Sequence, residues 1–217
     1  MKKIRFITFW FLILLSTATV TLDSYGQNNN SGGETTDLLT YDEGVVINGI
    51  KWATRNVDTP GTFVDKPEDW GMIYQWNRNI GWDFFNSQIN TNNGGWDSSY
   101  PVGATWEKTN DVCPSGYRVP TDSELQSLVS AGSRWVILEG VNGRLFGSGD
   151  NVIFLPAAGC RHDSNGMLCS TTGSSGNYWS STQWDKFFAY NLFFNRNKVE
   201  QSIFDRRFGQ SVRCVAE

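Results

Sequence analysis

The 217-residue sequence contains few charged residues and a single histidine, and each scarcity excludes a class of protein. Only 18% of the residues are charged, and Lys and Arg never form a run longer than two. Nucleic-acid binders neutralise phosphates with clustered basic side chains, so we expect no binding to DNA or RNA. Ten tryptophans and a net charge of only −4 exclude a disordered chain, because such chains are poor in aromatic residues.

His162, the single histidine, gives little basis for imidazole chemistry. It lies between Arg161 and Asp163 in a polar segment, and no Gly-x-Ser-x-Gly motif marks a nucleophile that it could activate. We therefore interpret His162 as a loop residue and expect no catalytic triad.

The one long hydrophobic run lies near the N-terminus. Residues 6–15 are apolar and follow three basic side chains, but a membrane-spanning helix needs roughly 20 residues. With Ser24 and Gly26 at positions −3 and −1, this pattern predicts a signal peptide that is cleaved before Gln27. Cleavage after Ala18 and an uncleaved anchor helix are the alternatives.

Cleavage divides the chain into a signal peptide at 1–26, a flexible polar leader at 27–37 and one domain at 38–217. It removes three of the 18 basic and one of the 22 acidic side chains, which changes the net charge from −4 to −6. The first cysteine, Cys113, lies too far along the chain to carry a lipid at the cleavage site. We expect an exported protein without a membrane span, extracellular or at the cell surface, with the periplasm as the alternative.

The domain shows one helical pattern and many short strand patterns. Residues 44–57 carry β-branched and aromatic residues around an Asn-Gly dipeptide, which predicts a hairpin. Residues 119–131 predict a helix with Thr121 as its N-cap and Glu124 completing a capping box. Further strands are predicted at 71–76, 151–158, 178–182, 187–194, 198–204 and 208–215.

Residues 70–106 are rich in Asn, Gly and Trp and show no sustained helical period, which predicts a long ordered loop region. Loops of this kind often carry function. The whole pattern is typical of an α+β fold in which antiparallel sheet dominates the C-terminal half.

Four cysteines in an exported chain predict two disulfides, for which three pairings exist. We favour Cys160–Cys169, which flank a short polar loop. The other pair is then Cys113–Cys214, which ties the start of the helical region to the last strand. No Cys-x-x-Cys motif and no second histidine support a zinc site.

Three ordered motifs carry a family resemblance: VCPSGYRVPTDSEL at 112–125, YWSST at 178–182 and GQSVRCV at 209–215. From about residue 44 to the C-terminus, the chain resembles the Fibrobacter succinogenes major paralogous domain family of exported bacterial proteins. This resemblance implies a single domain of C-type-lectin-like α+β fold, and it places Cys113 and Cys214 at positions expected to pair. It implies no activity, because the family has no settled one.

Residues 117–125 also resemble, more distantly, the helix start of the formylglycine-generating, sulfatase-modifying enzymes. Those enzymes use a reactive cysteine pair. Here Cys160 and Cys169 lie in a different local setting, and Cys214 belongs to a motif expected to be disulfide-bonded. The resemblance therefore does not extend to the catalytic cysteines.

Three tryptophans that precede an aspartate are candidates for ligand binding. An indole face can stack on the apolar face of a sugar ring while a neighbouring carboxylate accepts hydrogen bonds from its hydroxyls. The predicted ligand-binding residues are the three pairs Trp82-Asp83, Trp96-Asp97 and Trp184-Asp185. The other tryptophans of the domain are expected in the core: Trp52, Trp70, Trp76, Trp106, Trp135 and Trp179.

Several carboxylates of the loop region are candidates for acid/base chemistry: Asp65, Glu68, Asp69, Asp83 and Asp97. A glycoside hydrolase needs two carboxyl groups that face each other across a cleft. The spacing of these residues specifies no such pair, so we interpret them as solvated loop residues.

Calcium is disfavoured as a sugar-binding ion. A calcium site gathers about six to eight oxygen ligands, and the sequence lacks the Glu-Pro-Asn, Gln-Pro-Asp and Trp-Asn-Asp triplets of familiar sugar sites. We predict no cofactor and no metal, with an unrelated calcium site in the Asp/Asn loops as the alternative.

Taken together, the residues predict an exported, non-catalytic recognition module. We expect it to bind a glycan or a surface protein through residues 65–97 and the turn at 183–186. Two alternatives belong to other classes. One is an exported enzyme on the same fold, either a modifying enzyme or a carboxylate-dependent hydrolase, and the other is a structural subunit of a surface assembly.

Overall fold

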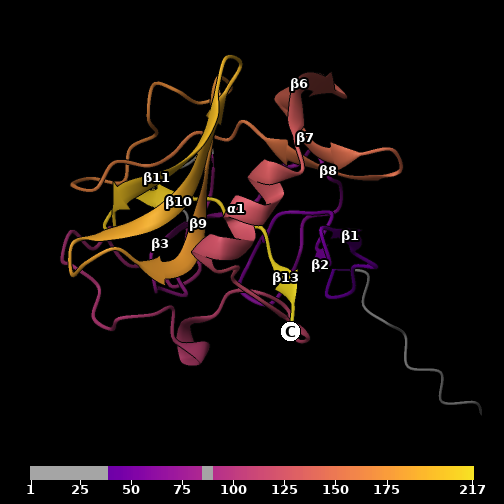
Figure 1. Cartoon of the computed structure of the whole chain (residues 1–217). Helices are drawn as coiled ribbons and strands as arrows, with labels where there is room; N and C mark the ends of the chain where they lie inside the picture. Colours follow the sequence, from indigo (N-terminus) through magenta and orange to yellow (C-terminus); the bar gives the residue numbers. More distant parts are fainter. Residues whose placement is uncertain (1–38, 85–89) are drawn as a thin grey trace, which may run out of the picture. The chain divides into compact units, whose positions relative to one another are not determined.

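The computed structural model describes residues 39–84 and 90–217 (Figure 1). The predicted signal peptide at 1–26 and leader at 27–37 lie outside the described residues. Within the described ranges, no helix is long and apolar enough to cross a membrane.

The N-terminal half contains β1 (Val45–Ile47), β2 (Ile50–Trp52), β3 (Ile73–Gln75), β4 (Gly81–Trp82), the 3-10 turn η1 (Lys108–Asn110) and β5 (Tyr117–Arg118). The C-terminal half contains α1 (Asp122–Ser130), β6 (Ser133–Leu138), β7 (Val141–Ser148), β8 (Asn151–Pro156), β9 (Ser175–Gln183), β10 (Phe188–Asn195), β11 (Val199–Asp205), β12 (Gly209–Gln210) and β13 (Val215–Ala216).

The predicted N-terminal hairpin is confirmed as β1 and β2. Asn48 and Gly49 form its turn with φ of 51° and 81°, values that these two residue types adopt more easily than others. The C-terminal strand β13 pairs antiparallel with both β2 and β5 and completes a sheet of order β1-β2-β13-β5. Figure 1 shows β13 lying near β2, so the end of the chain is packed against the start of the domain.

The predicted strands near residues 178–204 form an antiparallel sheet of order β11-β10-β9. One face of this sheet packs against α1 (Figure 1). Leu192 of β10 and Leu125 and Leu128 of α1 are buried in the same hydrophobic cluster. The helix is therefore held by its apolar face, as its sequence pattern predicts.

The predicted capping box of α1 is confirmed. The Thr121 hydroxyl accepts a hydrogen bond from the Glu124 backbone N–H, and the Glu124 carboxylate accepts one from the Thr121 backbone N–H at 2.7 Å. These bonds satisfy N–H groups that have no partner within the helix. Arg118 adds two hydrogen bonds to the same carboxylate at 2.6 and 2.8 Å.

The hairpin of β6 and β7 was not predicted from the sequence. The two strands pair from Ser133 to Leu138, and β7 pairs in turn with β8. Glu139 and Gly140 form the turn with φ of 46° and 83°. The hairpin was missed because Glu is not a residue that usually adopts positive φ, so the turn lacks the familiar Asn-Gly or Asp-Gly signal.

The strand predicted at 208–215 is instead two short strands, β12 and β13. Between them, the backbone pairs with residues 53–57: Ala53 N–H donates to Cys214 O, and Val57 N–H donates to Val212 O. The fully buried Arg213 guanidinium bonds Asn56 Oδ1 and the backbone carbonyls of Ala53 and Phe154. The buried charge of Arg213 thus finds its acceptors inside the domain, in segments far from it in sequence.

Both predicted disulfides are confirmed. The antiparallel sheets and the single α-helix of the described residues also confirm the α+β class. Cys113 pairs with Cys214 across 101 residues, and Cys160 pairs with Cys169 across nine. Of the tryptophans expected in the core, four are at least 93% buried and two are half-buried. The four are Trp52, Trp76, Trp106 and Trp179, and the half-buried two are Trp70 and Trp135.

Candidate functional site

The three predicted Trp-Asp pairs lie in three different environments. Trp82, on β4, is only 3% exposed and belongs to a core cluster with Ile73 and Phe84. Trp96 lies against it with ring centroids 4.9 Å apart, and its indole N–H donates to the backbone oxygen of Asp163 at 2.9 Å. The prediction of an exposed Trp82 is therefore wrong, because the indole fills the space beside β3, the strand with which β4 pairs.

Two of the three predicted aspartates stabilise their own loops. Asp97 accepts hydrogen bonds from the Arg78 guanidinium and from the Ser99 backbone N–H. The bond from Arg78 is the main reason why the pKa of Asp97 is lowered to about 2. Asp185 Oδ1 accepts from the backbone N–H groups of Phe187 and Phe188 at 2.7 and 2.8 Å. Both carboxylates are engaged within their own loops, and Asp83 lines a pocket that is described below.

Trp184 is the exposed member of the predicted set. Its side chain is 56% exposed, and its ring meets the ring of Tyr190 edge-on with centroids 5.4 Å apart. Tyr190 of β10 stands opposite Ile203 of β11, which is also exposed. We call these three residues, together with Phe188, the Trp184 face.

The Trp184 face continues the side of the sheet that α1 covers. Side chains alternate between the two faces of a strand, so Tyr190 lies on the same face as Leu192, which α1 buries. Where α1 begins, at Asp122, the covered part of this face ends. Gln201, opposite Leu192, hydrogen-bonds with the side chains of Asp122 and Gln126 there. Polar amide and carboxylate groups thus border the exposed aromatic residues.

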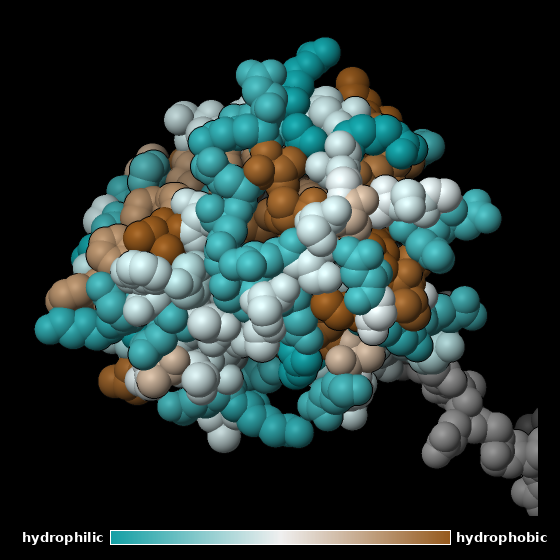
Figure 2. Space-filling view, in the orientation of Figure 1, coloured by the Kyte–Doolittle hydropathy of each residue, from teal (hydrophilic) through white to brown (hydrophobic). Residues whose placement is uncertain are grey.

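The surface around these elements is mixed rather than continuously apolar. On the side of the molecule seen in Figure 2, hydrophobic residues form separate groups with hydrophilic residues between them. Small aromatic areas bounded by hydrogen-bonding groups suit a polar ligand with apolar faces better than a large apolar partner.

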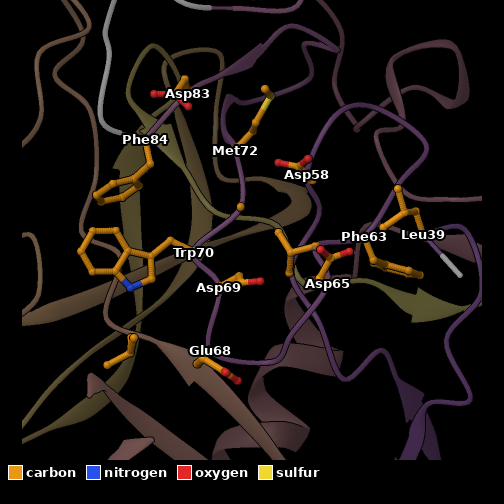
Figure 3. Close-up of a pocket in the computed structure, with 13 residues that line it drawn as sticks. Leu39, Asp58, Phe63, Asp65, Glu68, Asp69, Trp70, Met72, Asp83 and Phe84 are labelled. Atoms are coloured by element: carbon orange, nitrogen blue, oxygen red, sulfur yellow. The ribbon is translucent and has the colours of Figure 1, made fainter. Parts of the chain in front are cut away.

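A pocket of about 560 Å³ is lined mainly by residues 58–72, together with Asp83 and Phe84 of the predicted loop region (Figure 3). Its volume is within the range of roughly 300–1,000 Å³ that small-ligand sites occupy. Five of the thirteen lining residues are acidic, and none is basic. The lining consists of Leu39, Asp58, Phe63, Val64, Asp65, Glu68, Asp69, Trp70, Gly71, Met72, Asp83, Phe84 and Val141.

The carboxylates of the pocket influence one another. The pKa of Asp58 is raised above its ordinary value, mainly by burial and further by the negative charges of Asp83, Asp65 and Asp69. Four of the carboxylates that the sequence left as solvated loop residues therefore share one concave site: Asp65, Glu68, Asp69 and Asp83. Asp58 and the aromatic wall of Trp70 and Phe84 were missed, because spacing along the chain does not show which loops meet.

The remaining candidates from the sequence are His162 and a possible metal site. His162 is exposed in its loop, as predicted, with its ring 5.7 Å from that of Phe208. Across residues 39–84 and 90–217, no three His, Cys, Asp or Glu side chains are grouped to hold a metal ion.

The described residues thus contain two separate candidate sites, the Trp184 face and the acidic pocket. They share no residue. Comparison of the chain with family models, curated proteins and solved structures gave no match.

Proposed function

We propose that the protein is an exported, non-catalytic recognition module of C-type-lectin-like fold that binds a glycan through the Trp184 face. The observation that carries the proposal is the exposed indole of Trp184, held edge-on by Tyr190 where α1 no longer covers the sheet. A sugar ring that stacks on this indole replaces water on an aromatic surface whose position is already fixed. Few protein side chains lose conformational freedom on binding, so the entropic cost of binding is small.

Polar side chains beside the Trp184 face supply the second requirement. Asp122 and the amides of Gln126 and Gln201 offer both donors and acceptors for sugar hydroxyls. Their mutual hydrogen bonds fix their positions before a ligand arrives. Such preorganisation favours affinity, because fewer side chains lose freedom on binding.

The C-type-lectin-like part of the proposal is supported by the way in which the last strand pairs with strands from the start of the domain. The last strand, β13, lies between β2 and β5, and the Cys113–Cys214 disulfide joins it to the segment before α1. The resemblance in sequence implies this same pairing of cysteines. Export is supported by the two disulfides, which form and persist in oxidising compartments.

Binding rather than catalysis is proposed because the acid/base candidates lie away from the Trp184 face. His162 is an exposed loop residue, Asp97 is bonded to Arg78, and the other four carboxylates line the separate acidic pocket. Beside the Trp184 face, the Asp122 carboxylate accepts a hydrogen bond from the side-chain amide of Gln201. This arrangement holds a ligand by contact and hydrogen bonding.

The proposal is tested by screening the purified protein on a glycan array and titrating the strongest ligand into variants. We expect Trp184→Ala to weaken binding at least about fivefold, by analogy with bases stacked on aromatic side chains, where alanine substitution costs on the order of 1–3 kcal/mol. The matched control is Ile137→Ala, which removes a 68% exposed apolar side chain from β6. Equal affinities for the wild type and Trp184→Ala would refute the proposed site.

A further inference from the structure

The strand β6 forms one edge of the sheet β6-β7-β8, and glycan binding at the Trp184 face does not use it. We propose that β6 pairs antiparallel with β6 of a second copy of this chain and so joins two copies into a two-fold symmetric dimer. The inference is independent of the glycan proposal, because β6 and the Trp184 face share no residue. It rests on the unpaired backbone groups of the strand, its exposed apolar side chain and the charges at its two ends.

Every second residue of β6 directs its backbone polar groups away from β7. Gly147 N–H donates to Gly132 O, so the even-numbered residues of β6, which follow at alternate positions, are the ones that hydrogen-bond with β7. The N–H and C=O groups of Ser133, Trp135 and Ile137 therefore point outward. Within the part of the chain that the structure describes, no backbone–backbone hydrogen bond engages these groups. Figure 1 shows β6 at the outer side of its sheet, where a second extended strand can pair with the whole row.

The edge of β6 lacks the features that usually protect an edge strand, which are lysine, proline, a bulge or a covering element. Its six residues, SRWVIL, pair with β7 in an unbroken register, and Ile137 is 68% exposed. The other long edge, β11, carries two negative charges, Glu200 and Asp205, and the Gln201 side chain hydrogen-bonds with α1. Two copies of β11 would repel each other, whereas β6 is open to pairing.

The charges at the two ends of β6 favour an antiparallel copy as the occupant. Arg134 lies near the start of the strand and Glu139 directly after its end, and both are exposed. Within the described residues, neither takes part in an ion pair. Antiparallel pairing brings Arg134 of each copy toward Glu139 of the other, whereas parallel pairing brings like charges together. Glu139 also has φ of 46°, where Asn or Gly fits more easily, so the turn itself gives no reason for a glutamate.

The apolar side chains favour one register of the two strands. Trp135 is half-buried, with its ring centroid 6.4 Å from that of Phe194, and Ile137 lies two residues further along the same face. When Val136 stands opposite Val136 of the second copy, each Trp135 stands opposite an Ile137. Pairs of an aromatic and a β-branched residue stabilise antiparallel strands. A shift by two residues would place Ile137 opposite Ser133 and lose both of these pairs.

Sedimentation equilibrium of the purified protein over about 1–300 μM measures the association. The paired surface is one short strand from each copy, so we expect a reversible dimer with a dissociation constant of about 10–100 μM. Ile137→Lys should weaken the dimer at least about tenfold, since it places two lysines in the pairing region.

The matched control is Val46→Lys, which adds the same charge at a 52% exposed apolar residue of β1. It should leave the dimer unchanged. A protein that stays monomeric over the whole range would overturn the proposal, and so would equal weakening by the two lysine variants. Assemblies larger than a dimer would also overturn it, because a two-fold pairing of β6 closes on itself.

Charge reversal tests the antiparallel arrangement. Arg134→Glu and Glu139→Arg should each weaken the dimer about 3- to 10-fold at low salt, because each brings like charges together at both ends of the strand pair. The double variant, which carries both reversals, should regain the wild-type dissociation constant to within about twofold. Circular dichroism checks that the single variants remain folded. A double variant that associates no better than either single variant would contradict the antiparallel pairing.

A cysteine cross-link tests the register. Val136 and its counterpart would form a non-hydrogen-bonded pair with Cα atoms roughly 4.5 Å apart, which is within the roughly 4.4–6.8 Å that a disulfide spans. Val136→Cys should therefore give a disulfide-linked dimer on a non-reducing gel after mild oxidation. The control Val46→Cys carries its cysteine at a more exposed position and should give little dimer. Equal yields would overturn the pairing at β6. A glycan array that finds no ligand would leave all of these measurements unchanged, so the two proposals fail separately.

Discussion

Trp82 and Trp184 are each followed by aspartate, yet the two indoles have opposite surroundings. Trp82 lies on β4, whose partner β3 is buried, so its indole enters the core. Trp184 follows the end of β9 at a corner of the sheet, where no element covers it. The Trp-Asp dipeptide indicates that the two side chains could stack on a ligand and hydrogen-bond with it. Whether the indole is exposed depends on neighbouring residues that come from distant parts of the chain.

Truncating these two tryptophans should therefore affect stability very differently. We expect Trp82→Ala to lower the free energy of unfolding by about 3–5 kcal/mol, because it leaves a large cavity beside Trp96. Trp184→Ala should lower it by less than about 1 kcal/mol, since the side chain is mostly in water. Urea unfolding followed by circular dichroism measures both values. A larger loss for Trp184→Ala would show that this residue stabilises the core rather than presenting a surface.

Among the elements, those with complete local signals were predicted correctly. The capping box of Thr121 and Glu124 and the turn at Asn48 and Gly49 each combine residue types that favour one backbone geometry. The hairpin of β6 and β7 and the division of β12 from β13 were missed. The first has an unusual turn residue, Glu139, and the second involves backbone pairing with residues 53–57, which lie far away in the sequence.

The turn of the β6–β7 hairpin should be improvable by substitution. Glu139 has φ of 46°, a conformation that is unfavourable for a long side chain and easier for Asn. We expect Glu139→Asn to raise the free energy of unfolding by about 0.5–1 kcal/mol, because an Asn-Gly turn suits this type of hairpin. Chemical denaturation against the wild type provides the measurement, with the exposed turn variant Asp150→Asn as the control. No gain in stability would show that other contacts determine this turn.

At the scale of the whole molecule, both disulfide pairings could be predicted, but the two candidate sites could be predicted only in part. Four of the five acidic residues of the pocket were candidates in the sequence, although they were interpreted as solvated loop residues, and Trp184 was a candidate for ligand binding. The sequence did not show that Asp58 and Trp70 meet Asp83 and Phe84 in one pocket, or that the Trp184 face continues the covered side of a sheet. Both facts arise from packing between segments that are far apart in sequence.

The two disulfides should stabilise the domain by different amounts. Cys113–Cys214 closes a loop of 101 residues and Cys160–Cys169 closes one of nine, so the longer loop restricts the unfolded chain more. We expect the double substitution of Cys113 and Cys214 by Ala to lower the free energy of unfolding by about 4–5 kcal/mol. The same change at Cys160 and Cys169 should lower it by about 2–3 kcal/mol. Denaturant melts of the two double variants provide the comparison, and the reverse order would contradict the argument.

The central claim, that a glycan binds at the Trp184 face, is tested most directly by the indole N–H signals of the tryptophans in a ¹⁵N-labelled sample. Each indole gives its own signal, so titration with the best glycan from the array shows which ring meets the ligand. We predict that the Trp184 signal shifts with saturation while those of the buried Trp52 and Trp82 stay in place. A saturable shift at Trp70 with an unchanged Trp184 signal would contradict the claim and place the glycan in the acidic pocket instead.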